Sequence, residues 1–160
     1  MPRLQASNAP PHDDELLGII LACQADAGFC DEIQAIYGQV DGELASLGVT
    51  CMGGGACCKF DLAGHRLYVS AGELAVLTKS ALPDISRCHN LRCPYQVGPR
   101  CYARQNRPLG CRTYFCRAGT NSLPQELYER FHQQIKNAHQ RHRLAYRYVE
   151  LTQAFRSCFA

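Results

Sequence analysis

The chain has 160 residues, of which 46% are hydrophobic and 19% charged, a composition that excludes an intrinsically disordered protein. It contains no apolar run of membrane length, and residues 1–18 lack the positive start and apolar stretch of a secretory signal. These features predict a reducing, cytoplasmic setting without a membrane partner. In such a setting the 11 cysteines are expected to serve a purpose other than disulfide bonding.

Charge is divided unevenly along the chain. Residues 1–86 hold 4 Lys/Arg and 11 Asp/Glu, a net charge of −7, whereas residues 87–160 hold 13 and 3, a net charge of +10. Such asymmetry is typical of proteins that contact nucleic acid. It also suits a metal site, because four thiolates around one divalent cation carry about two net negative charges that neighbouring arginines would compensate. Both interpretations stay open at this point.

The N-terminal third predicts a tail followed by helices. Residues 1–12 contain three prolines and are expected to form a flexible tail. Residues 13–47 have acidic residues at the start and apolar residues at helical spacing, which predicts helix. Gly28 is expected to divide this stretch into two helices. Gly48 is a suitable C-terminal stop.

The middle of the chain predicts one short strand, one short helix and a long irregular stretch. Residues 65–69 are typical of a strand, and Ser70 with Glu73 forms a capping box that opens a helix through about Lys79. Residues 84–121 have little periodicity and contain many prolines and glycines. A stretch this irregular is unusual inside a compact domain, and a metal is the usual way to order it.

Residues 122–156 predict one long helix, capped by Asn121 or Ser122, that packs against the first helices. Its apolar stripe comprises Leu127, Phe131, Ile135, Ala138, His142, Ala145, Val149 and Thr152. The predicted fold is therefore a single, mostly helical α+β domain over residues 13–158. A small irregular cysteine-rich metal lobe, with a short strand or hairpin, is expected between the terminal helices.

The strongest chemical signal is a group of seven cysteines in two segments: Cys51, Cys57, Cys58, Cys93, Cys101, Cys111 and Cys116. Thiolates are soft anionic donors that bind zinc and iron–sulfur clusters, and a tetrahedral zinc takes four of them at about 2.3 Å. Seven exceeds four, so two metal sites, a reactive spare thiol or a buried structural thiol remain open. Cys88 has no clear partner and is expected to be a buried thiol. A disulfide framework is the main alternative for the whole group.

The segments CMGGGACCKF and CPYQVGPRCYARQNRPLGCRTYFC resemble the zinc- or iron-chelating cysteine-cluster family, the YkgJ-like CxxCxxCC domain, over about residues 48–117. That family shows Cys-x2-Cys-Gly-Ala-Cys-Cys, then a Ser-x-x-Glu helix start, then Cys-x5-Arg-Pro-x2-Cys-Arg. The matching positions are Cys51, Gly55, Ala56, Cys57, Cys58, Ser70, Glu73, Cys101, Arg107, Pro108, Cys111 and Arg112. Gly54 stands where the family's second cysteine stands, so Cys93 or Cys116 would have to replace that ligand. The resemblance implies metal binding and leaves zinc and iron both open.

Other residues are weaker candidates for a site. Arg107 and Arg112 could bind an anion, or could instead compensate thiolates or lock a loop carbonyl. His139 and His142 are spaced to face one metal, although a solvated or packed face is the commoner role. His65 or His89 could complete a mixed Cys/His shell.

Two alternative functions follow from the same sequence. The resemblance extends to the flagellin lysine methylases, which implies an iron–sulfur-dependent, methyltransferase-like enzyme as the first alternative. A nucleic-acid-binding adaptor is the second, since the basic half of the chain carries aromatic residues at positions 95, 102, 114 and 115. Neither a substrate nor a protein partner can be named from the sequence.

Overall fold

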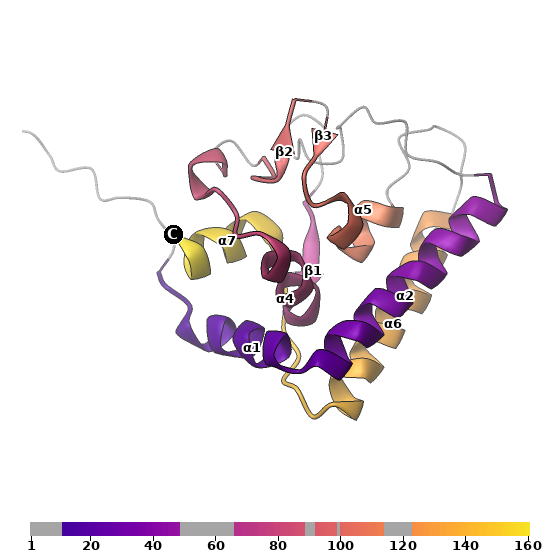
Figure 1. Cartoon of the computed structure of the whole chain (residues 1–160), viewed down its shortest axis with the longest axis horizontal. Helices are drawn as coiled ribbons and strands as arrows, with labels where there is room; N and C mark the ends of the chain where they lie inside the picture. Colours follow the sequence, from indigo (N-terminus) through magenta and orange to yellow (C-terminus); the bar gives the residue numbers. More distant parts are fainter. Residues whose placement is uncertain (1–10, 49–65, 89–91, 99, 114–122) are drawn as a thin grey trace, which may run out of the picture.

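The computed structural model describes residues 11–48, 66–88, 92–98, 100–113 and 123–160. Helices dominate and the strands are short, which confirms the predicted α+β class (Figure 1). The elements are α1 (Asp14–Ala25), α2 (Ala27–Ser46), β1 (Tyr68–Ser70), α4 (Ala71–Ser80), the 3-10 turn η2 (Ile85–Arg87), β2 (Gln96–Val97), β3 (Arg100–Cys101), the 3-10 turn η4 (Arg104–Asn106), α5 (Leu109–Thr113), α6 (Leu123–Arg141), β4 (Tyr148–Glu150) and α7 (Leu151–Phe159).

Two helices form at the N-terminal end, as predicted, and each starts at an aspartate. The Asp13 carboxylate accepts the Leu16 N–H at 2.9 Å, and the Asp26 carboxylate accepts the Phe29 N–H at 2.9 Å. The break therefore falls at Asp26 and not at Gly28, because a carboxylate that caps a new helix sets the boundary more strongly than a glycine does. Gly48 has a φ of +70°, the left-handed geometry expected of a helix stop.

The predicted capping box is present and connects a strand to a helix. Ser70 ends β1 and caps α4: the Glu73 N–H donates to Ser70 Oγ at 3.2 Å, and the Ser70 N–H donates to Glu73 Oε2 at 2.8 Å. β1 pairs with β4 in antiparallel register, Val69 opposite Val149. The second ribbon, β2 with β3, is also antiparallel, with Gln96 opposite Cys101.

The prediction of one helix over residues 122–156 is wrong. α6 ends at Arg141, and Arg143 adopts a φ of 54°. The Leu144 N–H then donates to His139 O at 2.9 Å and the Arg143 N–H to Gln140 O at 3.1 Å, which is a Schellman termination. The chain reverses so that β4 can pair with β1 before α7 begins. Helical periodicity cannot reveal this, because the strand is stabilised by a partner about 80 residues away.

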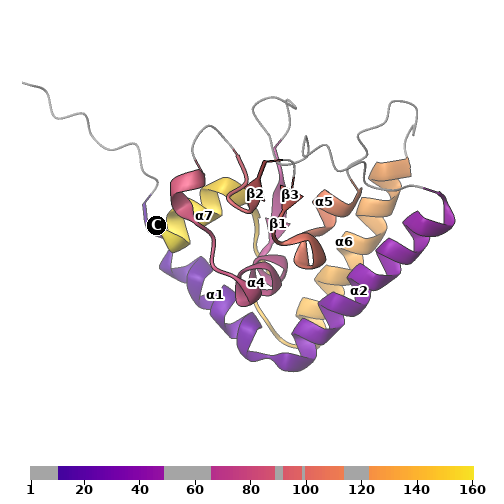
Figure 2. The same ribbon diagram turned by 45° about the horizontal axis from the view of Figure 1, so that its top comes forward.

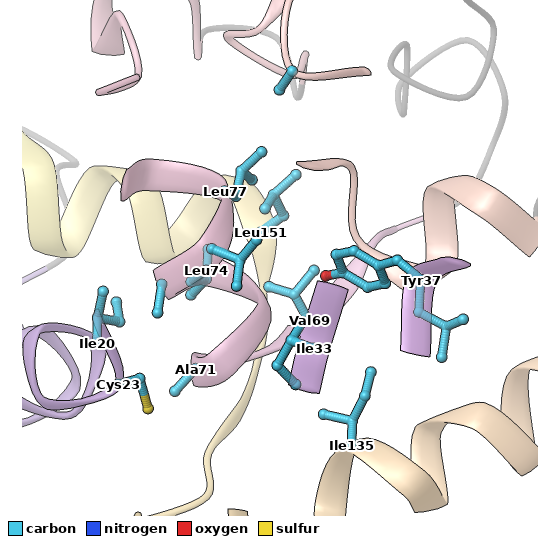
Figure 3. Close-up of a cluster of buried hydrophobic side chains, with 14 of the residues drawn as sticks. Ile20, Cys23, Ile33, Tyr37, Val69, Ala71, Leu74, Leu77, Ile135 and Leu151 are labelled. Atoms are coloured by element: carbon cyan, nitrogen blue, oxygen red, sulfur yellow. The ribbon is translucent and has the colours of Figure 1, made fainter. Parts of the chain in front are cut away.

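The apolar stripe of α6 is buried up to that termination, and α6 packs against α2 as predicted. α4 lies in the angle between α1 and α2 and packs against both helices (Figure 2). Figure 3 shows the resulting core, in which Tyr37, Leu74 and Ile135 come from three different helices. Ala145 is exposed and Val149 belongs to β4, so the predicted stripe does not extend past the end of the helix.

Within the described parts of the chain, the search for a bilayer-spanning helix finds none of sufficient length and hydropathy.

Candidate metal centre

The structure describes three of the seven predicted ligand cysteines, Cys93, Cys101 and Cys111. The other four predicted ligands lie outside the described residues: Cys51, Cys57, Cys58 and Cys116. The candidate histidines His65 and His89 also lie outside them. No disulfide joins any two of the described cysteines, so the framework alternative gains no support from this part of the chain.

Of the three described cysteines, Cys101 lies in β3 and Cys93 lies just before β2. The Gln96 N–H donates to Cys93 O at 3.2 Å, which folds Cys93 back onto the start of β2. Cys101 lies opposite Gln96 in the register of the ribbon. The Tyr102 N–H closes the same turn with a 2.9 Å bond to Tyr95 O. Cys93 and Cys101, which have seven residues between them in the sequence, thus lie at the same small hairpin.

Cys88, which is not among the predicted ligands, lies close to this hairpin. Its side chain is buried, and Arg156 donates a hydrogen bond to its carbonyl oxygen. Burial, and then the neighbouring Cys93, raise the pKa of the Cys88 thiol to about 12. Burial is the main cause of the raised pKa of Tyr95, and the nearby thiols of Cys93, Cys88 and Cys101 add to it. The sequence did not predict that Cys88 lies near Cys93.

The third described thiol, Cys111, lies on α5 and is held from two sides. The Cys111 N–H donates to Pro108 O at 3.0 Å, in the first turn of the helix. The Leu109 N–H donates to Glu73 Oε1 at 2.8 Å, so the capping carboxylate of α4 also caps α5. α5 contacts α2, and Cys111 packs partly against the buried core. Burial is the main cause of the raised pKa of Tyr37 on α2, and Cys111 makes a small contribution to it.

Arg112 fixes the loop that precedes Cys111. Its Nε donates to Arg107 O at 2.9 Å and its Nη2 to Gln105 O at 2.5 Å, while Nη1 contacts Asp41 Oδ2 at 2.5 Å. Its guanidinium also lies over the Tyr37 ring, 4.2 Å from the centroid. For Arg112, the interpretation as a lock on loop carbonyls is confirmed. Asp41, its partner on α2, had no sequence signal.

The two candidate histidines, His139 on α6 and His142 just after its end, take part in different contacts. His139 is buried and its Nδ1 bonds to Ala145 O at 3.0 Å. His142 instead contacts Glu32 at 2.8 Å and Asp26 at 3.2 Å. Each ring is therefore engaged in packing or ion pairing. Across the described residues, no three Cys, His, Asp or Glu side chains converge to hold a metal.

The four cysteines outside the described residues lie in two segments of the chain. The described residues that border these segments lie on one side of the molecule. Residues 49–65 connect the end of α2 to β1, and residues 114–122 connect α5 to α6. In Figures 1 and 2 these bordering residues and the β2–β3 ribbon lie opposite the turn between α1 and α2. The fold thus attaches both cysteine segments to the same end of the helical core.

Comparison of the chain with models of known families, with curated proteins and with solved structures gives no match.

Proposed function

We propose that this protein binds a metal through cysteine thiolates, either zinc or iron, the iron alone or in an iron–sulfur cluster. The observation that carries the proposal is the attachment of both cysteine segments to one end of the fold. The ligands would come from the seven cysteines named above, with Cys93, Cys101 and Cys111 as the described members. A reducing cytoplasm, in which thiols persist, is part of the same proposal.

The donor chemistry of the described residues fits such a group. Thiolates suit zinc and iron, and each must be deprotonated to bind. Cys88 is not one of the proposed ligands, and burial raises the pKa of its thiol to about 12, so it stays protonated at neutral pH. A bound metal supplies the positive charge that favours the thiolate form.

Two described side chains hold the segment that carries Cys111 in place. Glu73 holds the first residue of α5, and Arg112 holds the loop carbonyls before it. Cys111 is therefore presented from a segment fixed by bonds that need no metal. A preorganised ligand lowers the ordering cost of binding, and the metal would then order the remaining segments.

Anaerobic purification with elemental analysis and a visible spectrum tests this proposal. We expect zinc or iron bound to the protein, a colourless solution for zinc, and visible charge-transfer absorption for iron. Cys101→Ser and Cys111→Ser should lower the metal content, whereas Cys158→Ser, in a buried position on α7, should not. Protein that lacks both metals and contains mapped disulfides would contradict the proposal.

Metal removal provides a second test. Because the metal is proposed to order part of the chain, a chelator should reduce the thermal stability and alter the circular dichroism. Both should recover when the same metal is restored. An unchanged melting curve after complete removal would exclude a structural role.

A further inference from the structure

One side of α6 carries aromatic and cationic residues that the metal proposal does not use. Tyr128, His132, Lys136 and Gln140 follow one another at a spacing of four along α6, and Arg143 lies two residues after the end of the helix. Residues at this spacing lie in a row along a helix. The core-facing row, which includes Phe131 and Ile135, is a separate one. Tyr128 packs partly against the core, whereas Lys136 is half-buried and Gln140 and Arg143 are exposed, so the row is accessible from Lys136 onwards.

The upper part of this row joins a surface of stacked rings. Tyr128 stacks on His132 with centroids 5.3 Å apart and planes at 16°. His132 meets the edge of Tyr148 at 4.9 Å, and Tyr148 lies 5.6 Å from Tyr68 of β1. Tyr68 is 47% exposed and Tyr148 is 43% exposed. Two neighbouring strands thus each carry a partly exposed tyrosine ring.

The lower part of the row borders a cavity of about 660 Å³, which is lined by Lys136, Gln140, Arg143, Leu144 and Tyr146 among others. The Lys136 ammonium lies 5.6 Å from the Tyr146 centroid. In the described part of the chain, no carboxylate pairs with Lys136 or Arg143, whereas Arg141 and Arg147 of the same region pair with Glu32 and Asp13. Two cations thus remain at the cavity for an anionic ligand.

The backbone of Arg143 has an unfavourable conformation. Its φ of 54° is the left-handed geometry at which helix terminations of this type usually have glycine. Strained positions in a fold are concentrated at functional sites. The side chain retained here places a guanidinium at the rim of the cavity, which glycine would not provide.

We propose that the surface from Tyr68 to Arg143 binds single-stranded nucleic acid, with bases stacking on Tyr68 and Tyr148 and phosphates contacting Lys136 and Arg143. Exposed aromatic rings and nearby cations without a carboxylate partner are the two features that the binding of single-stranded nucleic acid requires. A duplex buries its base faces and cannot stack on such rings. The aromatic residues differ from those that the sequence suggested: Tyr95 is buried, and positions 114 and 115 lie outside the described residues.

Fluorescence anisotropy with a labelled RNA or DNA of about eight nucleotides tests the proposal on the full chain, purified without oxygen. We expect saturable binding that is tighter for the single strand than for the same sequence as a duplex. Lys136→Gln with Arg143→Gln should lower the salt slope by roughly 0.7 per lost phosphate contact. Tyr68→Leu should weaken binding about tenfold.

Control variants test whether binding depends on this surface or on exposed charges and rings in general. Lys79→Gln with Arg87→Gln removes the same charge from exposed positions on other elements, and Tyr102→Leu removes a ring that is 76% exposed. Both should leave binding unchanged. The proposal is overturned if no saturable binding occurs at low salt, if the control variants weaken binding as much, or if inorganic phosphate or a mononucleotide competes as well as the strand does.

Discussion

At the scale of single residues, Gly72 shows how closely the helices approach. A Cβ at this position would lie 2.5 Å from Phe29 Cζ and 2.6 Å from His139 Nε2. Both atoms belong to rings that are buried between helices, so neither can move aside cheaply. Gly72 thus allows the first turn of α4 to contact α2 and α6.

We therefore expect Gly72→Ala to lower the free energy of unfolding by about 1–3 kcal/mol through overpacking. The matched control is Gly42→Ala in α2, where nothing lies within 4 Å of the added Cβ. That change should raise stability by about 0.5–1 kcal/mol, because alanine favours helix. Urea titration measures both. Equal effects of the two substitutions would show that the contact around Gly72 is looser than described.

Glu73 is a buried carboxyl group that connects two helices. Burial raises the pKa of Glu73 above its ordinary value of 4.5, and the bonds from Ser70 and Leu109 oppose that rise. Because the folded state favours the neutral acid, the contribution of Glu73 to stability is full below pH 4.5 and is lost as the pH rises through the raised pKa.

Glu73→Gln is expected to cost about 1–3 kcal/mol, because its NH₂ group must face the N–H of either Ser70 or Leu109. The stability difference between wild type and variant should shrink as the pH rises from about 4 to 8, since only the wild type titrates here. Urea unfolding at several pH values measures this difference. A difference that grows with pH would mean that the charged carboxylate is the favoured form.

At the scale of elements, local signals predicted two helix caps and the stop at Gly48, but they did not predict the end of α6. The Ser70 capping box and the Asp13 cap depend on neighbours within three residues, and both formed as expected. The end of α6 depends on Arg143, a residue type that rarely terminates helices in this way. The strand that follows depends on β1, which is distant in sequence.

Arg143→Gly should raise the free energy of unfolding by about 1 kcal/mol, because glycine adopts a positive φ without steric cost. The same change should weaken nucleic-acid binding if the proposed surface is correct. Thermal unfolding and anisotropy test the two effects on one variant. Gln140→Gly, in the last turn of α6, should instead destabilise by about 1 kcal/mol. Destabilisation by Arg143→Gly would show that the side chain makes contacts that outweigh its backbone strain.

At the scale of the whole molecule, Arg112 connects the cysteine-bearing segment to the helical core. Its guanidinium reaches α2 and two loop carbonyls at once, which lysine cannot do with a single ammonium group. Arg112→Lys should therefore lower the free energy of unfolding by about 2–4 kcal/mol and reduce the metal content.

Arg104→Lys is the control for this change, because Arg104 is exposed on a neighbouring turn of the same segment. It should alter neither property. Denaturant titration and elemental analysis of both variants measure the effects. If Arg112→Lys keeps full stability, the bonds to Gln105 and Arg107 do not hold the segment.

The sequence by itself determined the fold class, the first two helices, the capping box, and the cysteines as candidate ligands, because these depend on composition and on neighbours a few residues apart. It could not determine the β1–β4 pairing, the proximity of Cys88 to Cys93, or the partners of Glu73 and Arg112. Each of these joins residues that are distant along the chain or that lie in segments without periodicity, and only the packing of the helices brings them together. The rings and cations of the proposed binding surface also come together only in the folded chain, because β4 must return to lie beside α6.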